Sequence, residues 1–482
     1  MSAVETRPGE AVVALPAGAG AGLLARCERA VRRARRSGRE VLLAHTVRVG
    51  ADVDPSAVAL ASRVAGEPWF CFEQADREAA ALAGVGCVRR LEARGPRRFA
   101  AVAAAWRELA AAAEADAPDG PRGAGLAAVG GFAFAAEGGA APHWDGFPPA
   151  GLTVPELAIA RRGRDVRVTV AALAQPDDVP EALARRLAAR LGALRATPLP
   201  LLDPAPVGRF QVFSVAPPEH YEEAVARAVQ RIRAGEFEKI VLAREVAVHA
   251  PHAHDAAAVF GVLRDAFRSC YVFCVGDGAG AAFVGASPEL LVRREGSRAS
   301  TVALAGSTRR SADPAVDDHL GEQLLRSDKD REEQAIVARR IVRALRPHAV
   351  WVAAPDEPAV VKVANIQHLA TPIRAQLTTP LSAVELAGLL HPPPAVGGEP
   401  HAAAVPRIPA LEGLDRGWYT GAIGWTDANE DGEFCVGLRC ALLRGREARL
   451  YAGVGVVRDS DPAAELAETE TKLGALLPVL SG

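Results

Sequence analysis

The sequence predicts an α+β protein organised around a large, mostly antiparallel β-sheet. Two observations support this class. Many short apolar stretches follow one another at hairpin-like spacing, and only a few long amphipathic stretches interrupt them. A chain of 482 residues can also bury a large core, either as one big domain or as two moderate ones.

The composition argues against several classes of protein. The formal net charge is -2, so no basic field favours binding to nucleic acid or to a membrane surface. The N-terminus lacks the basic and apolar regions of a signal peptide, and no apolar run approaches the ~20 residues that span a bilayer. We therefore expect a soluble, cytoplasmic protein without a nucleic-acid or membrane partner.

The cysteines are consistent with a reducing compartment. None forms a CxxC pair, and all lie in apolar contexts, which is typical of buried free thiols. The seven are Cys27, Cys71, Cys87, Cys270, Cys274, Cys435 and Cys440.

The first part of the chain alternates helices and strands. Residues 1–20 are rich in Ala, Gly and Pro and are predicted to form a disordered tail. Apolar periodicity predicts helices at residues 23–36, 99–115 and 180–196. Strands are predicted at residues 41–49, 68–73, 126–135, 152–161 and 165–172. The Pro-rich residues 198–206 are the best candidate for an internal boundary, which divides the chain into residues 21–205 and 206–482.

The second part is richer in strands. Helices are predicted at residues 220–234, 257–267 and 327–345. Strands are predicted at residues 237–245, 270–276, 281–285, 290–292, 302–308, 360–369, 419–426 and 433–443, with the Glu289 carboxylate between a turn and the strand at 290–292. Lys239 is notable because alternation places it on one strand face with Val241 and Ala243, where a lysine is either functional or extends along the apolar surface to solvent.

A Gly-punctuated strand near the C-terminus leads into an acidic helix. Ser460 or Asp461 can cap this helix, and Glu465, Glu468 and Lys472 follow at spacings of three and four residues, on one face. One interpretation is a solvated face with a Glu468–Lys472 pair. The small-residue strand beside it instead favours a ligand site, because ligands approach such a backbone closely.

A second acidic pair, Asp330 and Glu333, has the same spacing on an earlier helix. Two facing carboxylate pairs repel each other unless a cation lies between them. Mg²⁺ takes oxygen ligands and commonly uses one or two carboxylates together with ligand oxygens and waters. The two pairs therefore predict a magnesium site.

Six motifs in one order complete the pattern. They are GASPELL at residues 285–291, LAGS at 304–307, KDREE at 329–333, HL at 368–369, GWYTG at 417–421 and E-x-x-E-T-x-x-K at 465–472. Together they resemble the chorismate-utilising enzymes, namely the isochorismate, salicylate, anthranilate and aminodeoxychorismate synthases. The resemblance implies two α/β subdomains around a many-stranded sheet, with the site in a cleft. It makes residues 206–482 the chorismate-binding catalytic region and residues 21–205 the variable N-terminal part.

The resemblance also implies an acid and a base. Glu289 matches the acid that protonates the leaving C4 hydroxyl, and the apolar strand around it favours the protonated carboxyl. Lys239 matches the base that activates water for attack at C2, and burial favours its neutral form. The alternatives are a structural carboxylate that accepts turn N–H bonds and an ion-paired lysine.

Further site residues follow from the same resemblance. Mg²⁺ is expected to bridge Glu333 and Glu468 to the ring carboxylate, with Asp330 and Glu465 in support. The expected substrate-binding residues are Gly306, Ser307, His368, Ala395, Tyr419, Arg439, Gly453 and Lys472. Among these, Arg439, Tyr419 and the Gly453 backbone match positions that bind the enolpyruvyl carboxylate. A structural role for His368 stays open.

The branch of the family follows from Lys239 and from the loop at residues 390–400. The water-adding branch carries this lysine, whereas anthranilate synthases lack it and use ammonia, so no glutamine amidotransferase subunit is expected. Pro393 and Gln334 depart from the usual Thr and His. The sequence thus predicts a monomeric, Mg²⁺-dependent isochorismate synthase that serves menaquinone, salicylate or catecholate siderophore synthesis. The alternatives are a salicylate synthase, an ammonia-using subunit and an inactive chorismate-binding regulator.

Overall fold

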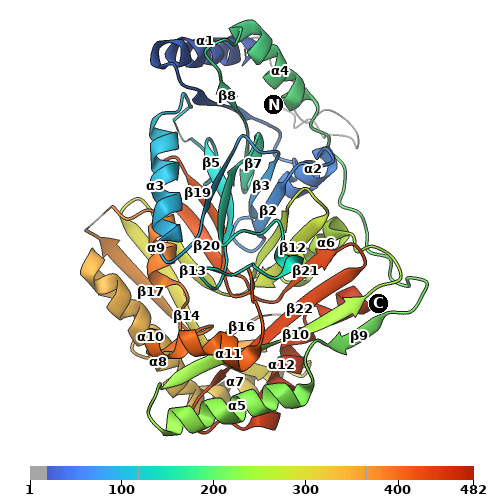
Figure 1. Ribbon diagram of the computed structural model, residues 1–482, viewed down its shortest axis with the longest axis vertical. Helices are drawn as coiled ribbons and strands as arrows, with labels where there is room; N and C mark the ends of the chain where they lie inside the picture. The colour runs from blue at the N-terminus through green and yellow to red at the C-terminus, as the bar shows by residue number, and fades with distance from the viewer. Residues whose placement is uncertain (1–18, 118, 364–365, 379) are drawn as a thin grey trace.

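The computed structural model describes residues 19–117, 119–363, 366–378 and 380–482. The α+β class is confirmed, and the antiparallel strands of these residues are divided between two sheets of twelve and ten strands, here called the larger and the smaller sheet (Figure 1). The larger sheet has the order β1-β8-β7-β3-β2-β11-β12-β21-β22-β10-β18, with β9 beside β10. The smaller sheet has the order β15-β17-β14-β13-β20-β19-β5-β6-β4, with β16 beside β17.

The strands of the larger sheet are β1 (Val41–Arg48), β2 (Trp69–Gln74), β3 (Ala80–Val85), β7 (Leu157–Arg162), β8 (Asp165–Ala174), β9 (Gln211–Ser214), β10 (Lys239–His249), β11 (Tyr271–Gly276), β12 (Ala281–Ser287), β18 (Gly398–Glu399), β21 (Cys440–Arg444) and β22 (Glu447–Val456). Those of the smaller sheet are β4 (Arg89–Ala93), β5 (Ala127–Phe132), β6 (Ala150–Val154), β13 (Leu290–Glu295), β14 (Arg298–Arg309), β15 (Ala349–Ala353), β16 (Ala359–Lys362), β17 (Ile366–Leu377), β19 (Ala422–Asp427) and β20 (Gly432–Val436).

The helices surround these sheets. They are α1 (Ala19–Ser37), α2 (Pro55–Ser62), α3 (Arg98–Ala111), α4 (Pro180–Gly192), α5 (Pro218–Arg233), α6 (Ala256–Ala266), α7 (Pro314–Arg326), α8 (Asp328–Leu345), α9 (Ala383–Leu390), α10 (His401–Ala404), α11 (Ile408–Glu412), α12 (Pro462–Leu473) and α13 (Leu477–Ser481). In Figure 1, α1 and α4 pack together at the top, while α5 and α12 pack together at the bottom.

Strands from both parts of the chain share each sheet. In the larger sheet β2 pairs with β11, and in the smaller sheet β5 pairs with β19. An aromatic cluster fills the space between the sheets and includes Trp144, Phe283, Trp418 and Tyr419, all buried. Burying one such side chain contributes roughly 1.5–3 kcal/mol. Packing against this aromatic core thus fixes the position of Tyr419, a predicted site residue.

Two predicted strands prove to be pairs of strands from different sheets. Residues 152–161 form the end of β6 and most of β7, and residues 433–443 form β20 and most of β21. In each case the two strands belong to different sheets. The chain passes from one sheet to the other within each stretch, at Pro155 and Glu156 in the first and at residues 437–439 in the second. A third predicted strand, at residues 360–369, supplies residues 360–362 to β16 and residues 366–369 to β17, which pair with each other in the smaller sheet.

Other boundaries also needed correction. The strand expected at residues 302–308 is the C-terminal half of β14, which has twelve residues. Tyr419 and Thr420 lie in a turn before β19 and not in a strand, and Thr420 has a φ of 58°. The predicted tail is wrong for Ala19 and Gly20, which belong to α1, and its residues 1–18 lie outside the described residues, as do residues 364–365 of a predicted strand.

The thiols agree with the sequence analysis with one exception. All seven cysteines are free, and six are buried, but Cys87 is exposed. In the part of the chain that the structure describes, no helix combines the length and the apolar character needed to cross a membrane.

Candidate active site

One pocket gathers most of the predicted site residues. Of those residues, only Lys239 and Glu465 do not line it, and both lie directly behind its wall. The pocket is bounded by the β10–β22 edge of the larger sheet, the β13–β14 region of the smaller sheet and the first turns of α8 and α12. The predicted lining residues are Glu289, Gly306, Ser307, Asp330, Glu333, His368, Ala395, Tyr419, Arg439, Gly453, Glu468 and Lys472.

The strand β10 presents Lys239 from beneath the pocket. Its side chain is fully buried, and Nζ donates a hydrogen bond to Oε1 of Glu333 at 2.8 Å. Val241, two residues on and therefore on the same face, lines the pocket. An extended lysine that reaches solvent is thereby excluded, and an ion-paired lysine at the wall of the pocket is what the structure contains.

Glu289 lies just before β13, where the chain enters the smaller sheet. The residue is 5% exposed, and burial raises the pKa of its carboxyl to about 8, although Lys239 and Arg439 oppose the shift. Among the described residues, its hydrogen bonds involve only its backbone, whose N–H donates to Ser287 and whose carbonyl accepts from Val436 N. The carboxyl is therefore not held as an acceptor of turn N–H bonds, and it is largely protonated at neutral pH.

Each glutamate of the two acidic pairs has a lysine beside it. Lys239 contacts Glu333, Lys329 contacts Glu465 at 3.1 Å, and Lys472 contacts Glu468 at 2.8 Å. Asp330 instead accepts a hydrogen bond from Ser327. Lysine side chains therefore already offset the charge of three of the four carboxylates, so repulsion between the pairs does not by itself require a metal.

The positions of the acidic pairs near helix N-termini reduce the cost of placing their negative charges close together. Ser327 caps α8 and Asp461 caps α12, each by accepting a hydrogen bond from a first-turn backbone N–H. Both acidic pairs follow within the first two turns of their helices, where the positive end of the dipole favours carboxylates. Burial nevertheless raises the pKa of Asp330 and of Glu465, whereas Lys472 and Ser307 outweigh burial and lower that of Glu468.

The donor set determines which metal fits. Within the described ranges, no three His, Cys, Asp or Glu side chains are arranged to hold a metal ion by themselves. The pocket does present carboxylate oxygens from Asp330, Glu333 and Glu468. Mg²⁺ fits this set, because it usually binds through one or two carboxylates and completes its shell with ligand oxygens and waters.

Arg439 is a free cation in this pocket. Its guanidinium makes no ion pair or hydrogen bond with the described residues, and its backbone has a φ of 45°, which is uncommon for a residue with a side chain. Nearby, the Tyr419 ring stacks on Tyr451 with centroids 5.1 Å apart. A Cβ at Gly453 would lie 2.9 Å from the Tyr419 hydroxyl, so this glycine makes room for the tyrosine. The arrangement suits a carboxylate ligand.

His368 is neutral and has one unused nitrogen. Its Nδ1 lies 3.2 Å from the Gly306 carbonyl and so carries the proton, while Nε2 is buried with no partner in the described residues. Burial, with Arg439 and Lys472 nearby, lowers the pKa of the imidazole to about 3. The unpartnered nitrogen of a pocket residue is a hydrogen-bond acceptor for a ligand hydroxyl.

The remaining predicted residues line the pocket as scaffold or contacts. Gly306 has a φ of 70°, and Asp330 packs against it. Ser307 donates to Glu468, and Lys472 also donates to the Gly453 carbonyl at 2.9 Å. Ala395 lies on the wall formed by the loop before β18.

The two departures from the family pattern lie behind the pocket. Pro393 is buried, and its carbonyl accepts from the N–H groups of Val396 and Gly397. Gln334 is buried and donates to the Ala303 carbonyl and to Thr371, so it ties α8 to the β14–β17 pair. The amide thus has a structural role in place of a titratable neighbour.

Sequence reasoning missed Gly455. A Cβ there would collide with Oε1 of Glu333 and lie 2.9 Å from Cε of Lys239. Gly455 therefore leaves the space in which those two side chains meet. The signal was present in the sequence, because Gly453 and Gly455 are two residues apart and share one strand face.

We expect Gly455→Ala to lower kcat/KM on the order of 10²-fold without unfolding the protein. The new methyl group displaces the ends of two flexible side chains, and a displacement of about 1 Å in an active site has an effect of this size. Steady-state kinetics and circular dichroism measure both quantities. Gly192→Ala is the matched control, since a Cβ there meets nothing within 4 Å. Unchanged kinetics for Gly455→Ala would contradict the packing argument.

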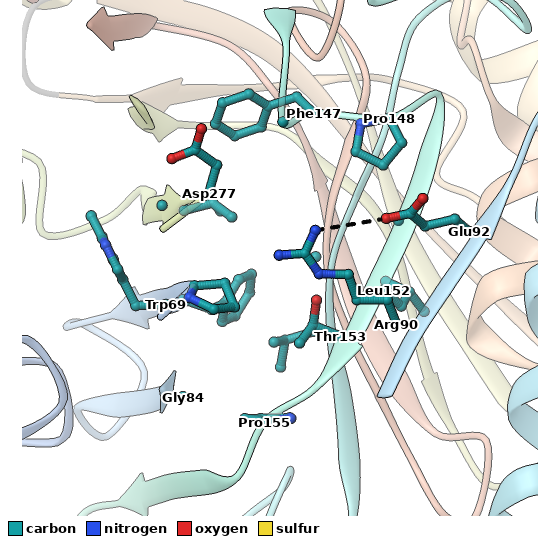
Figure 2. A pocket seen from close by; sticks show the side chains of 18 of the residues that line it. Trp69, Gly84, Arg90, Glu92, Phe147, Pro148, Leu152, Thr153, Pro155 and Asp277 are labelled. Atoms are coloured by element: carbon teal, nitrogen blue, oxygen red, sulfur yellow. Dashed lines mark ion pairs between the residues drawn. The ribbon is translucent and has the colours of Figure 1, made fainter. Parts of the chain in front are cut away.

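A different pocket, drawn in Figure 2, lies between β2 and β3 of the larger sheet and β4, β5 and β6 of the smaller sheet. Arg90 and Glu92 form an ion pair of 4.0 Å on its wall, opposite Asp277. It contains none of the predicted site residues. The candidate chemistry therefore belongs to the pocket between α8 and α12.

Comparisons with known proteins agree with this geometry. The family model described as "Chorismate binding enzyme" matches residues 28–481. The "Salicylate biosynthesis isochorismate synthase" of Pseudomonas aeruginosa is 37% identical over 466 residues, which cover 94% of this chain and 93% of the relative. "Isochorismate synthase MenF" of Bacillus subtilis is 33% identical over an alignment that covers 73% of this chain and 74% of the relative.

A solved structure has the same fold as this chain. The menaquinone-specific isochorismate synthase MenF from Escherichia coli superposes with a TM-score of 0.76 at 26% identity, covering 94% of this chain and 100% of that one. The family model spans nearly the whole chain, and the residues expected from the six motifs meet at one pocket. The chain therefore belongs to the family of chorismate-binding enzymes.

Proposed function

We propose that this protein is an isochorismate synthase that converts chorismate into isochorismate. Water adds at C2, the C4 hydroxyl leaves and the ring double bonds shift, so the net composition is unchanged and the enzyme is an isomerase. The names of the relatives support this assignment. The observation that carries it is Glu289, a carboxyl with a pKa of about 8 in the pocket whose wall also holds Lys239.

Glu289 is the proposed general acid. A hydroxide ion is a poor leaving group, so the C4–O bond breaks more readily when a proton is delivered to its oxygen. The raised pKa keeps that proton on Glu289 at neutral pH. The leaving group departs as water, and the glutamate is left as a carboxylate near Lys239 and Arg439, whose charges stabilise it.

Lys239 is the proposed general base. It removes a proton from the water that attacks C2, so the C2–O bond forms as the C4–O bond breaks. Its hydrogen bond to Glu333 fixes the position of the amine.

The remaining groups bind and orient chorismate. Arg439 is the free cation that pairs with the enolpyruvyl carboxylate, and the buried Tyr419 phenol, whose pKa burial raises, donates a hydrogen bond to it. The unpartnered Nε2 of His368 accepts a hydrogen bond from the C4 hydroxyl. Gly306 and Ser307 lie beside the ring, and Ala395 forms part of the opposite boundary.

Glu333 and Glu468 are the residues proposed to hold Mg²⁺, with Asp330 and Glu465 in support. When bound, the ion would neutralise the ring carboxylate and fix the substrate in place. The protein side chains supply the proton transfers.

The experiment that tests the function is incubation with chorismate and Mg²⁺ in water enriched in ¹⁸O. One ¹⁸O atom is expected in the isochorismate, because the new hydroxyl comes from solvent. Liquid chromatography with mass spectrometry identifies the product and its label. Chorismate that binds but does not react would instead make the protein a chorismate-binding regulator, and an amino product formed with ammonia would make it an ammonia-using synthase.

We further expect the reaction to stop at isochorismate, with little salicylate at neutral pH. Loss of pyruvate requires the C2 hydrogen to reach the enolpyruvyl methylene, so the side chain must fold over the ring. Ala395 leaves the pocket wall open, whereas a Thr at this position would add bulk and a stiff β-branched side chain. Salicylate fluorescence during chorismate consumption measures the outcome. Salicylate and pyruvate that rise in step with chorismate loss would identify a salicylate synthase.

A further inference from the structure

A buried ion pair that the motifs did not single out lies behind the pocket. Glu412 ends α11, and Arg416 follows four residues later, just before the turn that carries Tyr419. Their side chains are 1% and 2% exposed. Arg416 donates to both carboxylate oxygens of Glu412, from Nε at 3.0 Å and from Nη2. The pair is therefore a bidentate contact removed from solvent.

The other donors of Arg416 bind three separate walls of the pocket. Nη2 also donates to the Val241 carbonyl at 3.0 Å, and Nη1 donates to the Val396 carbonyl at 2.8 Å and to Oγ1 of Thr420 at 3.2 Å. Val241 belongs to β10, Val396 to the loop before β18, and Thr420 to the turn before β19. All three acceptor residues line the pocket, whereas Arg416 does not. One guanidinium thus joins three chain segments that are distant in sequence.

Glu412 adds a fourth connection. Its Oε1 accepts from the backbone N–H of Ala243 at 2.7 Å, so the pair holds β10 at two points. Ala243 lies on the same strand face as Lys239, four residues earlier. On the other side, the Arg416 carbonyl accepts from Tyr419 N at 2.9 Å, and the guanidinium lies 5.8 Å from the Tyr419 ring. The pair therefore links the strand of the base to the turn of the substrate-binding tyrosine.

The arrangement uses every donor that an arginine has. The five N–H groups are divided among the two Glu412 oxygens and the three pocket-wall acceptors. A lysine keeps the charge but offers three donors on one nitrogen and lacks the planar fork. A buried ion pair is weak evidence for stability, because desolvation offsets most of its attraction. Its geometry indicates instead a role in holding the three pocket walls at fixed positions relative to one another.

We propose that the Glu412–Arg416 pair is a positioning device for the reaction. It sets the distance between Lys239 on β10, Tyr419 in the turn and the Ala395–Val396 wall, and it contacts no substrate. The inference rests on the proposed function, since it assigns the pair to the site where chorismate reacts. Loosening the pair moves the base and the carboxylate-binding groups apart without removing any of them.

Arg416→Lys is the deciding variant. It is expected to fold and to lower kcat/KM on the order of 10²-fold, with effects on both kcat and KM, because small displacements of reacting groups carry such penalties. Arg190→Lys is the matched control. Arg190 also forms a fork, with Glu156 and Glu67, but it lies on α4 at the far end of the molecule from α12 (Figure 1). The control is expected to alter thermal stability alone.

Non-additivity separates positioning from a purely structural role. In a Lys239→Met background, Arg416→Lys is expected to lower kcat much less than in the wild type, since the group that it positions is absent. A lower melting temperature with wild-type kcat, KM and full additivity would overturn the proposal. If Arg416→Lys does not fold, Glu412→Gln decides by the same criteria, because it keeps an acceptor for Ala243 N–H.

A separate binding measurement distinguishes failure of this proposal from failure of the proposed function. Chorismate is titrated calorimetrically into Lys239→Met and into Lys239→Met/Arg416→Lys, where turnover is removed. Weaker binding in the double variant supports positioning of the carboxylate-binding groups, and equal binding together with unchanged kcat/KM in Arg416→Lys overturns it. A wild-type protein that forms no isochorismate overturns the proposed function, whatever these titrations give.

Discussion

EDTA abolishes turnover without unfolding the protein, and excess Mg²⁺ restores it: this is the largest effect that we expect. We expect turnover to fail because Glu333 and Glu468, the residues proposed to hold the ion, would then face the ring carboxylate of chorismate without its neutralising charge. The fold survives because Lys239, Lys329 and Lys472 already balance the three glutamates. Activity and the thermal unfolding curve are measured on the same metal-free sample.

Variants separate the metal from general charge effects. Glu333→Gln and Glu468→Gln are each expected to be nearly inactive yet folded, because each keeps the size of the side chain and loses a metal-binding charge. Glu236→Gln is the control, since Glu236 pairs with Arg231 and lies outside the pocket. Full activity of metal-free protein would contradict the magnesium assignment, and cooperative unfolding lost on EDTA treatment would contradict the role of the lysines.

Replacing the acid or the base is expected to produce the second largest effect. Glu289→Gln removes the proton donor and Lys239→Met removes the proton acceptor, and each loss is expected to lower kcat by roughly 10²–10⁴-fold. Both variants should still bind chorismate, because Arg439 and Tyr419 are untouched. Rapid-quench kinetics and calorimetry measure the two properties. Near-normal water addition by Lys239→Met would require another base.

The pH dependence identifies Glu289 as the acid. A general acid must be protonated, and burial raises the pKa of Glu289 to about 8. The reaction is therefore expected to proceed fully below that value and to slow as pH rises through it, which gives kcat/KM an alkaline limb near pH 8. The residual activity of Glu289→Gln is expected to lack this limb. If the alkaline limb persists in Glu289→Gln, the titrating group must be another residue.

Much of the site could be predicted because its chemistry is local. The helix spacing of Asp330 and Glu333, and of Glu465 and Glu468, places each pair on one helix face whatever the rest of the chain does. Alternation along β10 likewise puts Lys239 on the face of Val241. The resemblance then named twelve residues that line a single pocket, out of fourteen expected. Their roles in catalysis stay predictions.

Two of the predicted strands are wrong because the chain crosses between the sheets within them. Residues 152–161 and 433–443 are each predicted as one strand, yet each stretch supplies strands to both sheets. Hydrophobicity records burial and not the sheet in which a residue is buried. The split follows from strand pairing over long sequence distances, such as β2 with β11 and β5 with β19.

By itself, the sequence determined the α+β class, the two acidic helix starts, the lysine-bearing strand and the family. These features depend on residue type and short-range periodicity. The geometry of a helix or strand then decides which side chains share one of its faces. Tertiary structure alone decided which cation neutralises each carboxylate, how far burial raises the pKa of Glu289, and that Arg416 joins three pocket walls. Desolvation and charge pairing depend on distances across the fold, and those distances exist only once both sheets have formed.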